Sequence, residues 1–142
     1  MEVFVAGLTL IEESVRTQLR NEMIDVTERV RAAVAESKMR EGMAIVYVPH
    51  TTAAVTINEN ADPDVRHDLL AKLETLVPKH EHFYKHDEGN SDSHVKTSLV
   101  GNSATVLIDE GQLALGAWQG IYFCEFDGPR NRRLLIKLVS FD

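Results

Sequence analysis

Histidines are the most chemically distinctive residues of this 142-residue chain. Four of the six, His80, His82, His86 and His94, lie in one polar segment, and His50 follows a short apolar run elsewhere. Imidazole is the commonest metal ligand in proteins and the side chain that changes charge near neutral pH. Convergent histidines would therefore suit a divalent metal with an open coordination position, or acid–base chemistry. The chain has no HExxH or CxxC motif, so solvated loop positions are an equal alternative for His80 and His82.

Two hydroxyl side chains follow His50, where one predicted strand ends and the next begins. These are Thr51 and Thr52. Their hydroxyls, together with the free backbone N–H groups of a strand end, suit an anionic ligand. Threonine is also common in strands and turns, so a purely structural role is the open alternative. The local pattern thus predicts one polar pocket around these three residues.

Further polar residues are candidates for the same pocket. Asn58, Glu59 and Asn60 come just before a predicted helix, where side chains either reach a ligand or cap backbone donors. The glycine-containing segments 89–92 and 101–103 could present N–H groups to phosphate, although segments of this composition are usually only turns.

The last third of the chain adds candidates of a different kind. Gln119 opens an apolar strand, where a buried amide needs partners, and the neighbouring Trp118 is expected in the core or an interface. Cys124 lies among aromatic residues and is predicted to be a buried structural thiol. A basic cluster in a predicted turn is typical of a solvated edge: Arg130, Arg132 and Arg133.

Composition limits the class of protein. Apolar residues make up 44% and charged residues 26% of the chain, as in ordinary globular domains, so we expect a single domain over residues 1–142. The formal net charge of −7 argues against a nucleic-acid partner, because that surface needs clustered Lys and Arg. A single cysteine, no secretory signal and no long apolar run predict a cytoplasmic protein without a membrane partner.

Hydrophobic periodicity predicts the elements that must position these residues. An opening hairpin of segments 3–10 and 14–20 leads to a helix over 25–38, and a second helix over 62–78 begins with an Asp-Pro cap. The polar segment 79–94 is predicted to be a long loop. We therefore expect an α+β fold with a largely antiparallel or mixed sheet and two main helices. The other predicted strands are 43–48, 53–57, 104–108, 120–126 and 133–141.

Four stretches carry a resemblance when they are taken together: 50–54 (HTTAA), 58–65 (NENADPDV), 113–122 (LALGAWQGIY) and 125–130 (EFDGPR). The chain resembles the YjbQ family, also described as secondary thiamine-phosphate synthases, over essentially the whole domain. The resemblance implies a YjbQ-like α+β domain that assembles as a homotrimer. It also implies a polar pocket that includes the histidines at positions 50, 86 and 94.

The resemblance further implies a weak thiamine-phosphate synthase activity, which joins a hydroxymethylpyrimidine pyrophosphate to a thiazole phosphate and releases pyrophosphate. Such a reaction needs a cation or donors on the leaving group, and exclusion of water. On this hypothesis His50, His86 and His94 act in catalysis, either by holding a divalent metal, Zn or Mg, or by binding phosphate directly. Glu59 and Asp92 are the other predicted catalytic residues. The predicted substrate-binding residues are Thr51, Thr52, Asn58, Asn90, Gln119 and Arg130.

Two other interpretations remain open at this point. One is a non-catalytic module that binds a phosphorylated metabolite or a metal. The other is a structural trimer with no small-molecule role, which predicts that His50, His86 and His94 do not converge.

Overall fold

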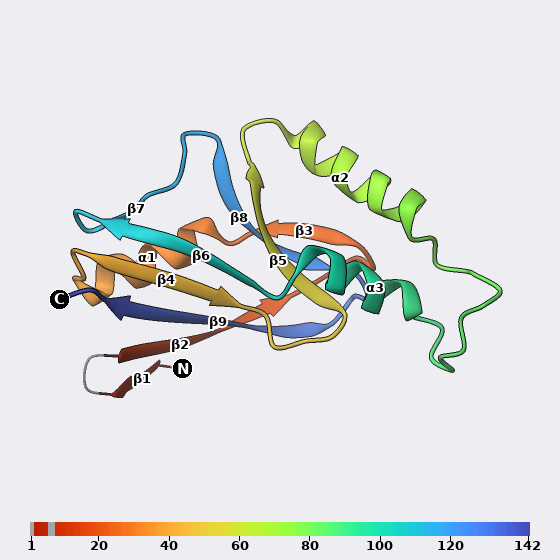
Figure 1. The fold of residues 1–142 in the computed structure, drawn as a ribbon, viewed down its shortest axis with the longest axis horizontal. Helices are drawn as coiled ribbons and strands as arrows, with labels where there is room; N and C mark the ends of the chain where they lie inside the picture. The colour runs from red at the N-terminus through yellow and green to blue at the C-terminus, as the bar shows by residue number, and fades with distance from the viewer. Residues whose placement is uncertain (1, 6–7) are drawn as a thin grey trace.

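Two antiparallel sheets form the frame of the molecule in the computed structural model, which describes residues 2–5 and 8–142 (Figure 1). The larger sheet has six strands in the order β1-β2-β9-β4-β6-β7. The smaller sheet has three strands in the order β3-β8-β5. The strands of the larger sheet are β1 Glu2–Val5, β2 Leu8–Arg16, β4 Gly42–Tyr47, β6 Ser103–Asp109, β7 Gln112–Leu113 and β9 Asn131–Ser140. Those of the smaller sheet are β3 Glu22–Asp25, β5 Ala53–Glu59 and β8 Gln119–Glu125.

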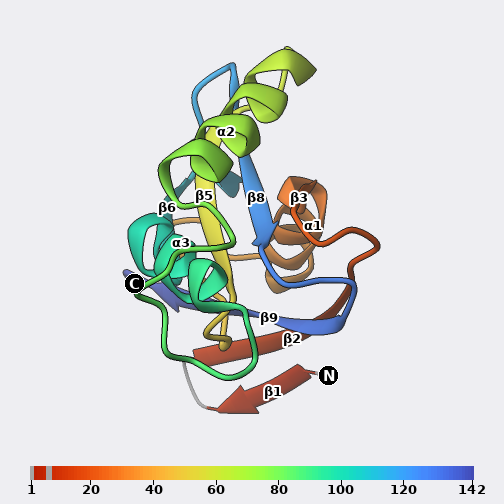
Figure 2. The ribbon, with the colours of Figure 1, turned by 90° about the vertical axis from the view of Figure 1, so that its right-hand side faces the viewer.

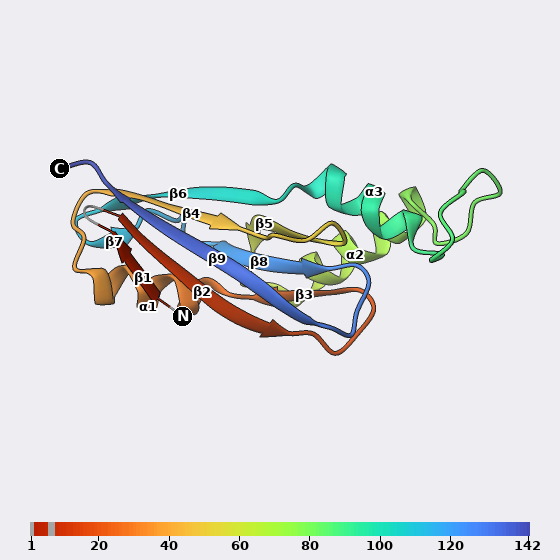
Figure 3. The same cartoon turned by 90° about the horizontal axis from the view of Figure 1, so that it is seen from below.

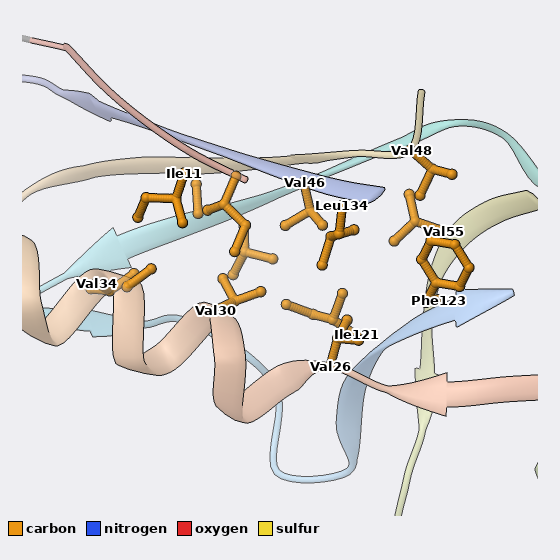
Figure 4. Packing of buried hydrophobic residues seen from close by; sticks show 14 of the residues in the cluster. Ile11, Val26, Val30, Val34, Val46, Val48, Val55, Ile121, Phe123 and Leu134 are labelled. Atoms are coloured by element: carbon orange, nitrogen blue, oxygen red, sulfur yellow. The ribbon is translucent and has the colours of Figure 1, made fainter. Parts of the chain in front are cut away.

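One face of the larger sheet is buried because side chains alternate along its strands. In β9, Leu134, Ile136 and Leu138 are fully buried, whereas the residues between them are more exposed. Helix α1 (Thr27–Ser37) and the smaller sheet lie over this face (Figures 2 and 3). Figure 4 shows the apolar side chains from both layers pointing toward one another between the sheet and the helix. The main core therefore lies between these two layers.

Helix α1 and helix α2 occupy the segments predicted from periodicity. In α1 the apolar face of Val30, Ala33 and Val34 is buried against the sheet. Helix α2 (Pro63–Leu76) begins where Asp62 accepts a hydrogen bond from the Asp64 backbone N–H at 2.9 Å. Both helices thus start and end within one or two residues of the expected positions.

The apolar stripe of α2 is less buried than its sequence predicts, since no residue of this helix is fully buried. Its leucines at 69, 70 and 73 pack at the edge of a second, smaller apolar cluster. The members of that cluster are Met23, Ala54, Tyr122, Cys124 and Phe126. The Cys124 thiol is buried there, as predicted, and burial raises its pKa to about 12.

A third helix shortens the loop predicted over 79–94, which the structure confirms only as far as Asn90. Helix α3 runs from Ser91 to Val100, so the described chain has three helices instead of two main ones. Periodicity does not reveal α3 because its buried face is polar. The buried residues are Asp92, Ser93, Lys96 and Thr97. The α+β class with antiparallel sheets is confirmed.

Candidate functional site

Three histidines that lie far apart in the sequence line one pocket of about 460 Å³. His50 belongs to the loop between β4 and β5, His86 precedes α3, and His94 lies in the first turn of α3. These segments meet the β8–β9 turn at one end of the two sheets (Figure 1). The full lining is Pro49, His50, Thr51, Thr52, His86, Glu88, Asn90, His94, Asp127, Arg130 and Arg132.

His86 and His94 form a pair at the mouth of the pocket. Their ring centroids are 5.3 Å apart and the ring planes are nearly perpendicular, at 85°. Glu88 lies beside the pair, with its carboxylate 3.9 Å from His86 Nε2. His86 is exposed and His94 is half-buried, so both rings are accessible from the solvent side. Two imidazoles in this arrangement offer two adjacent N–H donors to one ligand.

His50 is fixed differently, by the backbone of β9. Its Nε2 accepts a hydrogen bond from the Arg133 backbone N–H at 2.9 Å. Burial is the largest cause that lowers the pKa of His50, and the positive charges of Arg132 and Arg133 lower it further. The ring is therefore neutral at neutral pH, and a neutral ring that accepts at Nε2 carries its proton on Nδ1. His50 thus supplies an oriented donor without a charge.

A buried ion pair lies beneath the loop that carries His50. The Arg132 guanidinium donates to Glu125 through Nε at 2.9 Å and through Nη2 at 2.5 Å. The same Nη2 donates to Thr52 Oγ1 at 2.8 Å, which ties the loop to the sheet. Burial raises the pKa of Glu125, but hydrogen bonds from Arg132 and Thr17 outweigh it and hold that pKa below its ordinary value. A charged hydrogen-bond network therefore lies behind the part of the pocket lined by Thr52 and Arg132.

The opposite rim is held by Asp127. Its Oδ2 accepts from Arg130 Nη2 at 2.9 Å and from Asn90 Nδ2 at 2.8 Å, which joins the β8–β9 turn to the start of α3. Arg130 Nε donates to the Asp127 backbone carbonyl at 2.8 Å. The Nη1 group of Arg130 has no hydrogen bond to any part of the chain that the structure describes. It remains available to a ligand.

Three predicted site residues lie outside this pocket. Asn58 and Glu59 are at the far end of β5, where Glu59 pairs in register with Gln119 of β8. From Thr52 the extended strand rises by six residue steps to Asn58 and seven to Glu59, about 20 and 23 Å at roughly 3.3 Å per residue. Within one chain the structure does not bring these three side chains to the histidines, and their roles at a ligand stay a prediction.

Asp92 is also directed elsewhere. Its carboxylate is completely buried and accepts hydrogen bonds from Arg20 at 3.0 and 3.1 Å and from Lys96 Nζ at 3.0 Å. Although burial raises the pKa of Asp92, these partners lower it below its ordinary value. Asp92 therefore anchors α3 to the segment before β3 and does not line the pocket, so its role toward a ligand stays a prediction.

Arg132 is one of four pocket residues that the sequence interpretation missed, with Pro49, Glu88 and Asp127. The expectation of a solvated arginine edge holds for the exposed Arg133, which pairs with Glu12, but not for Arg132. The signal was present in the alternation of β9, because position 132 has the same parity as Leu134 and Ile136. An inward arginine on that face requires a buried partner, which is Glu125.

The remaining expectations concern His80, His82 and a bound metal. His80 and His82 are exposed in a neighbouring hollow of the loop before α3, to which His86 also contributes. Over residues 2–5 and 8–142, no three His, Cys, Asp or Glu side chains are placed as a metal-binding group. Metal binding by His50, His86 and His94 stays a prediction.

None of the helices that the structure describes is long and apolar enough to cross a membrane.

The two sheets, the covering helix and the histidine pocket define a class of small α+β proteins with a polar site where three loops meet. The chain belongs to the UPF0047, YjbQ-like family, whose model matches residues 11–140. It is 51% identical to a UPF0047 protein of Methanocaldococcus jannaschii, over 92% of this chain and 94% of the relative. It is 50% identical to the UPF0047 protein YugU of Bacillus subtilis, over 89% and 96%.

Solved structures agree with this assignment. A YjbQ/UPF0047 family protein of Clostridium acetobutylicum has a TM-score of 0.89 and 53% identity, covering 91% of this chain and 99% of that one. A protein of Sulfolobus solfataricus has a TM-score of 0.90 and 27% identity, covering 94% and 97%. It is described as a YbjQ-like protein of unknown function. Because these relatives carry no thiamine-phosphate synthase description, the expectation of that activity is corrected.

Proposed function

We propose that the histidine pocket binds the phosphate group of a phosphorylated small molecule. The observation that carries the proposal is the His86–His94 pair, whose rings lie 5.3 Å apart in the same pocket as Arg130. Imidazole and guanidinium N–H groups form short, charge-assisted hydrogen bonds with phosphate oxygens. A tetrahedral anion presents several oxygens at once, so it can engage donors that converge from different loops.

The surrounding groups support an anionic ligand over a cationic one. The neutral His50 ring and the Thr51 hydroxyl add uncharged donors to the same lining. Arg130 keeps its Nη1 donors free while Asp127 fixes the rest of its guanidinium. The carboxylate of Asp127 is thus already occupied, which leaves Glu88 as the unfavourable charge at the rim. A site of this kind holds the phosphate and leaves the rest of the molecule at the open mouth.

Calorimetric titration with inorganic phosphate tests the proposal. The double variant His86→Gln, His94→Gln removes both imidazole donors but keeps polar side chains of similar length. Charged hydrogen bonds contribute about 1.5–3 kcal/mol each, so we expect affinity to fall at least about tenfold.

The matched control is His67→Gln, which removes a histidine from the exposed surface of α2. This variant should bind phosphate as the unmodified chain does. Equal affinity of the double variant and the control would contradict the proposal.

The homotrimer implied by the family resemblance remains a proposal of its own. Exposed apolar side chains support association between copies: Tyr47 and Leu107 on the uncovered face of the larger sheet, and Leu76 and Leu99 on the helices. Sedimentation velocity should give a species of three times the 15.9 kDa chain mass. A single species at the mass of one chain would contradict this proposal.

A further inference from the structure

A second cavity lies beside the histidine pocket, where β2 ends and β9 begins. Its volume is about 630 Å³, and its lining is Arg16, Thr17, Gln18, Pro129, Arg130 and Asn131. None of the histidines contributes to it. The cavity is therefore separate from the pocket described above, although Arg130 lines both.

The walls of this second cavity are held by short hydrogen bonds. The Thr17 backbone N–H donates to the Arg130 carbonyl at 2.9 Å, and the Arg130 N–H donates to Thr17 Oγ1 at 2.8 Å. Arg16 and Asn131 are partners in the β2–β9 register. Thr17 is almost fully buried and also donates to Glu125 at 2.7 Å. The site is thus built on strand ends and on the same ion-pair network as the first pocket.

The charge of the lining is exceptional for this chain. Two arginines and no carboxylate line the cavity, on a chain whose formal net charge is −7. Arg16 is exposed, and its guanidinium has no hydrogen bond or ion pair within the residues that the structure describes. The second guanidinium, that of Arg130, is paired with Asp127, whose carboxylate is not part of this lining. Two arginines that line one cavity, one of them unpaired, are a site for an oxyanion.

Arg130 connects the two cavities. Asp127 holds its Nε and one Nη2 hydrogen, and its remaining donors stay free between Arg16 on one side and the histidines on the other. We propose that the cavity lined by Arg16 and Arg130 is a second anion subsite, which takes the second acidic group of a ligand whose phosphate lies at His86 and His94. This inference rests on the proposed function, and it extends the ligand class to small molecules with two separated anionic groups.

A pair of matched probes tests the second subsite. Fructose 6-phosphate carries one phosphate and fructose 1,6-bisphosphate carries two on the same sugar, and both are titrated by calorimetry at physiological ionic strength. We expect the bisphosphate to bind more tightly. Arg16→Gln should weaken bisphosphate binding at least about tenfold and change monophosphate binding less than about twofold.

The control is Arg31→Gln on α1, which removes the same charge from an exposed side chain that lines neither of the two cavities. It should affect neither probe. Equal effects of Arg16→Gln and Arg31→Gln, or equal affinity of the unmodified chain for the two probes, would overturn the subsite.

The two proposals fail in different ways. If the His86→Gln, His94→Gln variant keeps full affinity for the monophosphate, the proposed function fails. If that variant loses monophosphate binding while Arg16→Gln leaves bisphosphate binding unchanged, only the second subsite fails.

Discussion

Replacing Glu125 with glutamine removes one charge from the ion pair beneath the pocket while keeping the shape of the side chain. Glu125 is completely buried and accepts four hydrogen bonds, from Thr17, from the Asp127 backbone and twice from Arg132. Its partner Arg132 is only 6% exposed. The variant therefore leaves a buried guanidinium without a counter-charge.

The cost follows from that arrangement. Breaking a buried ion pair on one side costs about 3–5 kcal/mol, a large share of the roughly 5–15 kcal/mol that holds a domain folded. For a chain of this length, each kcal/mol lowers the melting temperature by about 2–4 °C. Urea unfolding followed by far-UV circular dichroism measures the loss, at one fixed protein concentration because association adds to apparent stability.

Two further variants isolate the cause. Glu28→Gln makes the same chemical change at a side chain that is 84% exposed and should alter stability by less than about 0.5 kcal/mol. The double variant Glu125→Leu, Arg132→Met should recover part of the lost stability, because apolar pairs often replace buried ion pairs without cost, whereas Thr17 and the Asp127 N–H lose their acceptor. It should still weaken phosphate binding, since Thr52 then loses the donor that holds its loop. A loss below about 1 kcal/mol in Glu125→Gln would refute this reasoning.

Three more predictions concern acid, capping and the thiol. Folding lowers the pKa values of Glu125 and Asp92. The stability that these two carboxylates contribute is therefore present above the ordinary carboxyl pKa of about 4 and is lost as the pH falls below it. A series of melting curves from neutral to acid pH should show that decline. Asp62→Ala removes the cap of α2 and should cost about 1 kcal/mol in urea unfolding, whereas Asp62→Asn should cost far less. Cys124, whose pKa is raised to about 12, should react with iodoacetamide only after unfolding, and rapid labelling of the folded chain would contradict its burial.

The fold was predictable for the elements whose apolar residues recur at regular spacing in the sequence and are buried in the structure. Helix α1 and strand β9 show their apolar faces directly in the sequence, at helical and alternating spacing. Helix α3 was hidden because its buried residues are Asp92 and Lys96 and their polar neighbours, so an ion-pair network replaces the apolar face that periodicity detects. A buried polar face places no apolar residues at helical spacing, so the sequence alone does not reveal it.

The site was predictable in part for a similar reason. His50, His86 and His94 share a pocket because three loops meet at one end of the sheets, a property of topology that residue types only suggest. Glu59 follows His50 closely in sequence, yet β5 carries it away from the pocket. Arg132 shows the opposite case, because strand parity places it inward while its charge suggests the surface.

The most direct measurement is the response of the histidine ring resonances to phosphate. In two-dimensional NMR spectra of the imidazole groups, added inorganic phosphate should shift His86 and His94 together, with one affinity, and leave His67 unchanged. Shifts of equal size at all three rings, or none at His86 and His94, would contradict a phosphate site between them.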